Sequence, residues 1–224
     1  MKYKVLSLLL IGLGVLVLVA CGNQSGNRDD LAPTSSEPVA TSQSPSYKEL
    51  YQASVFLGDS ITEGLAYHDV LDEENVLAGA GKTAEFTLME DDVDRLVEQK
   101  PERVFIQLGS DDILWPTDDP MEYSLSHYAK LIDNIKARLP KAKITLLSVT
   151  PVTADAEKKE PRYGNIREYN AGLETLADQK QVEYVNLTSL VTEHADLYDT
   201  DGIHFQAAFY PILLDYLATV RTDR

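Results

Sequence analysis

Ser60 and His204 are the residues of this sequence whose types and placement point most clearly to chemistry. Ser60 follows Gly58 and Asp59 where a short apolar run, Val55–Leu57, comes to an end. A serine hydroxyl becomes a good nucleophile only beside a general base, and Asp201-Gly202-Ile203-His204 supplies a histidine far downstream. The alternative is that Gly58-Asp59-Ser60 is only a turn, because all three residue types favour turns. The downstream histidine segment favours the catalytic interpretation.

The elements around Ser60 explain how its hydroxyl would be presented. The β-branched and aromatic run Val55–Leu57 predicts a buried strand that stops at Gly58, and the residues after Ser60 can begin a helix. That arrangement places the hydroxyl at the carboxyl edge of a sheet and near a helix N-terminus. The positive potential there favours the oxyanion of an acyl-transfer intermediate.

Further apolar segments alternate between strand and helix patterns. We expect strands at 76–78, 103–108, 143–149 and 182–187, and helices at 86–97, 125–139, 166–176 and 209–220. The central strands are apolar throughout, which predicts an α/β fold, a three-layer α/β/α sandwich with a mostly parallel sheet. Because ligands bind beyond the carboxyl ends of such strands, the loops that begin at Gly58, Gly81, Gly109 and Pro151 should gather at one edge.

Four of these segments resemble the sequence blocks of the SGNH (GDSL-type) hydrolases, in the family's order: Gly58-Asp59-Ser60, Gly81-Lys82-Thr83, Gly109-Ser110-Asp111-Asp112 and Asp201-Gly202-Ile203-His204. The resemblance implies a flavodoxin-like α/β/α fold and a serine esterase that needs no metal or organic cofactor. It also implies catalytic roles for Ser60 as nucleophile, His204 as general base and Asp201 as the residue that orients the imidazole. The oxyanion hole would use the backbone N–H groups of Ser60 and Gly81, together with the side chain at position 111.

Asp111 departs from the family pattern, which has asparagine at this position. An ionised carboxylate donates no hydrogen bond and repels a developing oxyanion, and loss of one oxyanion donor costs about 10²–10³-fold in rate. Three interpretations stay open. Asp111 is held protonated by burial and by neighbouring carboxylates; or it is turned aside and the two backbone donors suffice; or the site is weakened and serves binding.

The N-terminal residues predict an exported lipoprotein. Lys2 and Lys4 precede an apolar run that ends in Leu18-Val19-Ala20-Cys21, which resembles the bacterial lipoprotein signal. We expect a signal peptide at 1–20, a lipidated Cys21 (carrying acyl chains such as palmitate) with a flexible tether at 21–48, and the hydrolase domain at 49–224. The tether prediction rests on its Ser, Gly, Asn, Gln, Thr and Pro content. The alternative is a signal peptide with a chance cysteine at its end.

Composition limits the partners. Without Lys2 and Lys4 the chain keeps 18 basic and 36 acidic residues, a formal charge of −18, which argues against nucleic acid. Cys21 is the only cysteine, so no internal disulfide is possible. We expect a monomer that meets a small-molecule or glycan ester and touches the membrane only through its anchor, on the extracellular face of a bacterial cell.

The functional prediction is therefore a membrane-anchored serine esterase that removes acetyl or short acyl groups, on envelope or environmental glycans, through an acyl-enzyme. The alternatives are a catalytically weakened surface binding protein and a thioesterase or lysophospholipase. His68, His127 and His194 show no metal-ligand spacing, so we expect surface or capping roles and no metal site. Trp115 either walls the acyl pocket or packs within its loop, and packing is the simpler interpretation.

Overall fold

The computed structural model describes residues 45–222, which fold around a five-stranded sheet in the order β2-β1-β3-β4-β5. All neighbouring strands run parallel: β1 (Ser54–Gly58), β2 (Val76–Ala78), β3 (Arg103–Gln107), β4 (Lys143–Leu147) and β5 (Glu183–Val185). The helices are α1 (Tyr47–Leu50), α2 (Ser60–Tyr67), α3 (Ala84–Met89), α4 (Asp92–Gln99), α5 (Pro120–Arg138), α6 (Ala154–Lys159), α7 (Ile166–Lys180), α8 (Thr188–Glu193) and α9 (Phe209–Thr222). Short 3₁₀ turns complete the described chain: η1 (Glu73–Asn75), η2 (Asp112–Leu114), η3 (Pro161–Asn165) and η4 (Ala195–Leu197).

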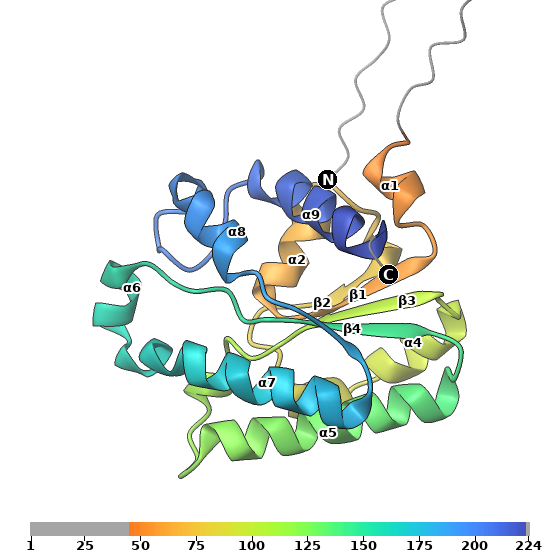
Figure 1. Cartoon of the computed structure of the whole chain (residues 1–224), viewed down its shortest axis with the longest axis horizontal. Helices are drawn as coiled ribbons and strands as arrows, with labels where there is room; N and C mark the ends of the chain where they lie inside the picture. Colours follow the sequence, from red (N-terminus) through yellow and green to blue (C-terminus); the bar gives the residue numbers. More distant parts are fainter. Residues whose placement is uncertain (1–44, 223–224) are drawn as a thin grey trace, which may run out of the picture. The chain divides into compact units, whose positions relative to one another are not determined.

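Two apolar cores lie on opposite faces of the sheet, because successive side chains of a strand point to opposite sides. Val55 and Leu57 join one core, with residues of α4, α5 and α7. Phe56, between them, joins the other, with residues of α2, α8 and α9. Figure 1 shows α2, α8 and α9 above the sheet and α4, α5 and α7 below it. The predicted three-layer sandwich is confirmed.

The strand order creates a crevice beside β1. The chain passes from β1 to β2 on one side and then to β3 on the other side of β1, so the crossovers diverge at the carboxyl ends of β1 and β3. Ligands of open α/β sheets bind at such a switch point. The loops that follow these two strands contain Ser60 and Asp111, which the sequence had placed in the candidate site.

The predicted elements differ from the observed ones in their bounds. The helix expected at 86–97 is two helices, α3 and α4, because Glu90 between them has extended backbone angles (φ −85°, ψ 179°). The break turns the Asp92 side chain inward, where it is 2% exposed and pairs with Lys82. The strands expected to reach 149 and 187 end at Leu147 and Val185.

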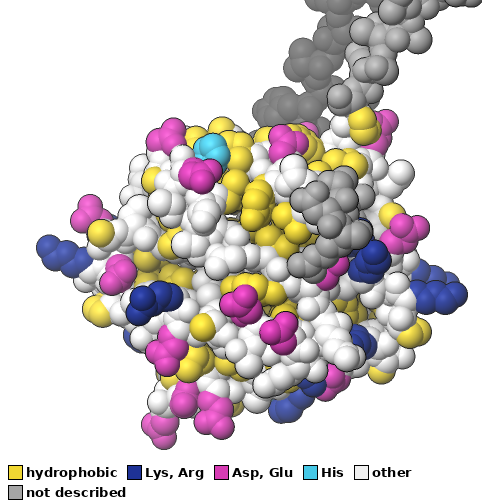
Figure 2. Space-filling view, in the orientation of Figure 1, with side chains coloured by type: hydrophobic (Ala, Val, Ile, Leu, Met, Phe, Trp, Pro, Cys, Tyr) yellow, Lys and Arg dark blue, Asp and Glu magenta, His cyan; other side chains and the backbone are white. Residues whose placement is uncertain are grey.

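The N-terminal predictions fall mostly outside the described residues. The signal peptide, Cys21 and the tether as far as residue 44 belong to that part of the chain. At its end, Ser46 and Glu49 form a capping box that starts α1 at Tyr47, so the helix takes in the last two residues of the expected tether. Within 45–222, no helix has the length and apolar character that a membrane span requires. Acidic side chains are scattered among basic ones over the face in Figure 2 rather than gathered into a single patch.

Candidate active site

Ser60 is the first residue of α2, directly beyond the carboxyl end of β1. Asp59 caps the helix, because its Oδ1 accepts a hydrogen bond from the backbone N–H of Ile61 at 3.0 Å. Gly58 permits the close approach of β3, since a Cβ there would lie 2.4 Å from the carbonyl oxygen of Gln107. The Ser60 hydroxyl therefore stands at a helix N-terminus, where free N–H groups and the helix dipole favour negative charge.

The segment from Asp201 to His204 is a turn held by one carboxylate. Oδ1 of Asp201 accepts hydrogen bonds from the backbone N–H groups of Ile203 at 2.8 Å and His204 at 2.9 Å. Its other oxygen, Oδ2, lies 2.5 Å from Nδ1 of the His204 ring. The same side chain thus shapes the turn and fixes the orientation of the imidazole.

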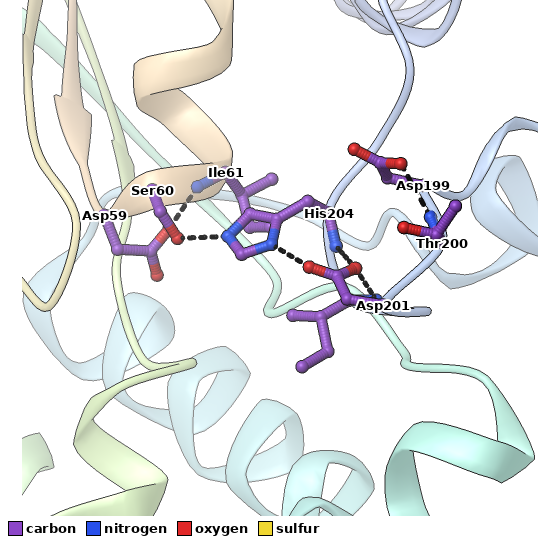
Figure 3. Close-up of polar contacts among 8 residues, drawn as sticks. Asp59, Ser60, Ile61, Asp199, Thr200, Asp201 and His204 are labelled. Atoms are coloured by element: carbon purple, nitrogen blue, oxygen red, sulfur yellow. Dashed lines mark hydrogen bonds and ion pairs between the residues drawn. The ribbon is translucent and has the colours of Figure 1, made fainter.

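Ser60, His204 and Asp201 form one hydrogen-bonded chain. The Ser60 Oγ lies 2.9 Å from Nε2 of His204, which is 144 residues away in sequence. In Figure 3 the imidazole lies between the hydroxyl and the Asp201 carboxylate. This geometry can pass a proton from Oγ to Nε2 while the carboxylate stabilises the resulting imidazolium.

Electrostatics favour an ionised Asp201. Partial burial acts to raise the pKa of Asp201, but the hydrogen bonds from His204 and from the backbone of Ile203 and His204 outweigh it and lower this pKa below its ordinary value. The carboxylate is therefore charged at neutral pH. Its side chain and that of His204 are 44% and 41% exposed, so solvent and substrate reach both.

The histidine turn is packed against the loop that follows β4. Gly202 has φ +74°, a left-handed conformation that favours glycine. A Cβ at this position would lie 2.0 Å from the Thr153 hydroxyl oxygen, and the Thr153 backbone N–H donates to the Gly202 carbonyl at 2.9 Å. These contacts hold the turn from Asp201 to His204 in place beside Ser60.

The loop around Gly81, the expected oxyanion loop, is held from two sides. Lys82 pairs with the buried Asp92 and, at 3.0 Å, with Glu90. Beyond it, the backbone N–H of Ala84 donates to Oδ1 of Asp112 at 3.1 Å. Gly81 itself has φ +76°. This left-handed conformation, which favours glycine, is secured by the flanking residues and orients the Gly81 N–H.

That N–H acts on the carboxyl group of Asp111. Burial raises the pKa of Asp111, while the charge of His204 and the backbone N–H of Gly81 act to lower it. One carboxyl oxygen, Oδ2, is buried and accepts no hydrogen bond from the described residues. The structure therefore places position 111 beside the expected oxyanion donor and within the field of the histidine.

Two further carboxyl groups behind the site are buried. Asp59 is 2% exposed, and burial raises its pKa to about 7, with added repulsion from Asp111 and Asp112. Asp112 is 3% exposed, and burial raises its pKa to about 6. Asp59 accepts a hydrogen bond from the Ser110 hydroxyl and Asp112 from the Ser124 hydroxyl. Both acids lie within family-like sequence blocks, but neither was predicted as a site residue, because their burial is not visible in the sequence.

The other candidates from the sequence have packing roles or lie elsewhere. Trp115 packs edge-on against Phe86, with ring centroids 5.2 Å apart. His127 contacts the Tyr123 ring and its carbonyl oxygen. Among residues 45–222, no group of three or more His, Cys, Asp or Glu side chains is arranged to hold a metal ion. His68, which was expected in a surface or capping role, lines the same cavity as Ser60 and His204.

Solved structures share this fold. A GDSL-like lipase from Bacteroides thetaiotaomicron matches with a TM-score of 0.61 and 22% identity over 74% of this chain and 85% of that chain. A lipase/acylhydrolase from Enterococcus faecalis gives 0.56 and 16%, over 73% and 93%. An acetylxylan esterase from Geobacillus stearothermophilus gives 0.54 and 18%, over 72% and 90%.

At these identities the likeness to solved structures shows a common fold. No curated protein sequence matches the chain. The family model of the GDSL-like Lipase/Acylhydrolase family, however, matches residues 56–212, a span that contains Ser60, Asp201 and His204. The chain is therefore a member of the GDSL-like lipase/acylhydrolase (SGNH) family and an ester-hydrolysing enzyme.

Proposed function

We propose that the protein is a serine esterase that cleaves acetyl or short acyl esters through an acyl-enzyme on Ser60. The observation that carries the proposal is the hydrogen-bonded chain from Ser60 through His204 to Asp201 at the carboxyl edge of the sheet. Glycan esters are the favoured substrates, since an acetylxylan esterase is among the structures with this fold.

The reaction proceeds in two balanced halves. Ser60 Oγ attacks the ester carbonyl carbon as Nε2 of His204 takes its proton, and the oxyanion forms beside the N–H groups of Ser60 and Gly81. The carbon–oxygen bond to the alcohol then breaks, and His204 returns the proton to the leaving oxygen. Water, deprotonated by the same nitrogen, then attacks the acyl carbon; the bond from that carbon to Ser60 Oγ breaks, and Nε2 returns the proton to Oγ as the acid leaves.

A profile of kcat/KM over p-nitrophenyl esters of increasing acyl length and over acetylated glycans tests this proposal. We expect the highest values for acetyl and short acyl groups, and loss of hydrolysis in Ser60→Ala. Equal turnover by wild type and Ser60→Ala would place the nucleophile elsewhere. A peak at long acyl chains would favour the lysophospholipase alternative.

A surface binding protein with weakened catalysis is the second candidate, and Asp111 favours it. A charged carboxylate beside the Gly81 N–H occupies the place where an oxyanion would be stabilised. If the protein is such a binding protein, the wild type should bind an acetylated glycan and hydrolyse it only slowly.

The proposed location is the extracellular face of a bacterial cell membrane, with the catalytic domain tethered through a lipid on Cys21. The sequence Leu18-Val19-Ala20-Cys21 and the composition of the following residues support it. On this proposal the domain acts on esters of the envelope or the surroundings, as a monomer.

A further inference from the structure

One face of α2 continues from Ser60 into a cavity. Ser60, Glu63, Gly64 and Tyr67 are spaced at i, i+3, i+4 and i+7, so they share a face of the helix. All four line a cavity of about 270 Å³, together with residues of the adjoining segments: His68, Ala80, Asp199, His204, Phe205 and Tyr210. Both Ser60 and His204 therefore open onto this cavity.

Aromatic rings form one wall. Tyr67 and His68 meet edge to face with ring centroids 4.9 Å apart, and His68 lies 5.2 Å from the ring of Tyr210. Tyr67 is 81% exposed at the rim, although it is a large aromatic residue. Gly64 leaves room for this wall, because a Cβ there would lie 1.8 Å from the Tyr210 hydroxyl oxygen.

Two polar side chains that line the cavity, Glu63 and Tyr210, are available to hydrogen-bond a ligand. Among residues 45–222, neither the Glu63 carboxylate nor the Tyr210 hydroxyl makes a hydrogen bond, and Glu63 has no ion-pair partner. The two residues line the same cavity, and burial and then the charges of Asp59 and Glu63 raise the pKa of Tyr210. Free acceptors and donors beside aromatic rings suit a ligand with several hydroxyl groups.

The lining of the cavity contains acidic side chains and no lysine or arginine. The acidic lining residues are Glu63 and Asp199. The Asp199 carboxylate is partly satisfied by the backbone N–H of Thr200 at 2.6 Å (Figure 3). A phosphate or carboxylate group would meet like charges here, with no cation to neutralise it.

The position of the cavity relative to Ser60 and His204 indicates which part of the ester substrate it holds. His204 must protonate the leaving oxygen, so the alcohol portion of the ester lies next to Nε2. The cavity is lined by Ser60 and His204, and it borders the oxyanion loop only at Ala80, since neither Gly81 nor Asp111 lines it. Its volume lies just below the usual range of about 300–1,000 Å³ for small-molecule sites, which suits a single sugar ring or a short polyol.

We propose that this cavity, the α2 cavity, is the subsite for the alcohol portion of the substrate, and that it selects uncharged polyhydroxyl alcohols over phosphate-bearing ones. The proposal rests on the proposed function, and it separates glycan or polyol esters from lysophosphatidyl and coenzyme A esters. Glu63 accepts hydrogen bonds from substrate hydroxyls and repels anions. Tyr67 contacts the apolar face of the ring.

The test compares two acetyl esters that differ only in a phosphate, 1-acetylglycerol and 1-acetylglycerol 3-phosphate. At low ionic strength we expect wild-type kcat/KM to favour the neutral ester by about tenfold or more, because a like charge at close range is weakly screened there. Glu63→Lys should lower this ratio by about tenfold. Tyr67→Ala should raise KM for an acetylated methyl xyloside by several-fold, with a smaller change in kcat.

A matched control distinguishes the effect of a charge in the α2 cavity from the effect of the protein's net charge. Glu122 is exposed on α5, which packs on the opposite face of the sheet, and Glu122→Lys makes the same charge change. It should leave the ratio at the wild-type value. Equal kcat/KM for the two glycerol esters in wild type, or the same ratio in Glu63→Lys and Glu122→Lys, would overturn the subsite. Failure of the wild type to hydrolyse even p-nitrophenyl acetate would instead refute the proposed function.

Discussion

The Ser110 hydroxyl donates a 2.5 Å hydrogen bond to Oδ2 of Asp59 and so joins the loop after β3 to the residue before Ser60. Asp59 also caps α2 through its other oxygen. One buried carboxyl thus links the two loops that border the crevice of the sheet. It does so at an electrostatic cost, because burial raises the pKa of Asp59 to about 7.

That pKa predicts a pH-dependent stability. A carboxyl whose pKa is near 4 in the unfolded chain and about 7 in the fold binds its proton more tightly when folded. The free energy of unfolding should therefore be highest below about pH 4 and fall as pH rises towards 7. Asp112 adds a contribution of the same sign up to about pH 6.

Asp59→Asn should reduce this dependence, because the amide still caps α2 and meets the Ser110 hydroxyl without a charge. Urea unfolding at pH 5 and pH 8 should show a difference smaller by roughly 1–4 kcal/mol than in wild type. Asp178→Asn, an exposed carboxyl on α7, is the control and should keep the wild-type difference. An Asp59→Asn protein with the full wild-type difference would contradict the assignment.

A second prediction concerns the ion pair behind Gly81. Lys82→Met leaves the buried Asp92 with only the longer ion pair to Arg95, at 3.9 Å, and loss of one partner of a buried pair costs up to about 3–5 kcal/mol. We also expect kcat for p-nitrophenyl acetate to fall by at least about tenfold, since the Gly81 N–H loses its support. Arg138→Met is the control, because it breaks the exposed pair with Asp94 and should cost about 1 kcal/mol or less. Equal stability and activity of the two variants would mean that Lys82 does not support the Gly81 loop.

The Lys82–Asp92 pair also shows where prediction from the sequence ends. The apolar run Val55–Leu57 and the alternation of strands and helices identified the fold, because burial on both faces of a sheet leaves a strong local pattern. The break at Glu90 brings Asp92 to Lys82, ten residues earlier in the chain, and such a pairing leaves no periodic signal in the sequence.

The candidate catalytic residues could be identified from the sequence for a different reason. Ser60 and the segment from Asp201 to His204 are short, local motifs, each shaped by its own turn. The α2 cavity was missed, although the spacing of Ser60, Glu63 and Tyr67 on one helix face could have indicated it. Its other wall comes from Tyr210 in α9, and only the fold brings that ring to Gly64.

Asp111 should make the reaction depend on pH in a way that asparagine does not. A protonated Asp111 donates to the oxyanion, so activity should fall as pH rises through its raised pKa. Asp111→Asn supplies a permanent donor and should remove the alkaline fall, with a gain of up to about 10²-fold there. The measurement is kcat/KM against pH on one ester.

Two outcomes would contradict this account of Asp111. A large loss in Asp111→Asn across the whole pH range would mean that the carboxylate has its own task in the site. No change in either the rate or the shape of the profile would mean that the side chain does not take part, and that the N–H groups of Ser60 and Gly81 suffice.

The anchor makes a prediction about location. Cys21→Ser should release the protein from bacterial membranes into the soluble fraction, because the lipid on Cys21 is the proposed attachment. The released protein should keep its esterase activity, since the described fold from residue 45 onward contains the whole candidate site. Protein that stays bound after a salt wash would argue against lipidation at Cys21.

The central claim is that Ser60 becomes acylated by His204-assisted attack. A fluorophosphonate probe followed by peptide mass spectrometry tests it most directly. We expect one adduct, on Ser60, whose rate of formation falls by several orders of magnitude in His204→Ala and less in Asp201→Ala, with no further loss when the two are combined. Ser60→Ala should give no adduct, and neighbouring Ser110 should stay unmodified. An adduct on Ser110, or full hydrolysis of esters by an enzyme that the probe never labels, would contradict the account.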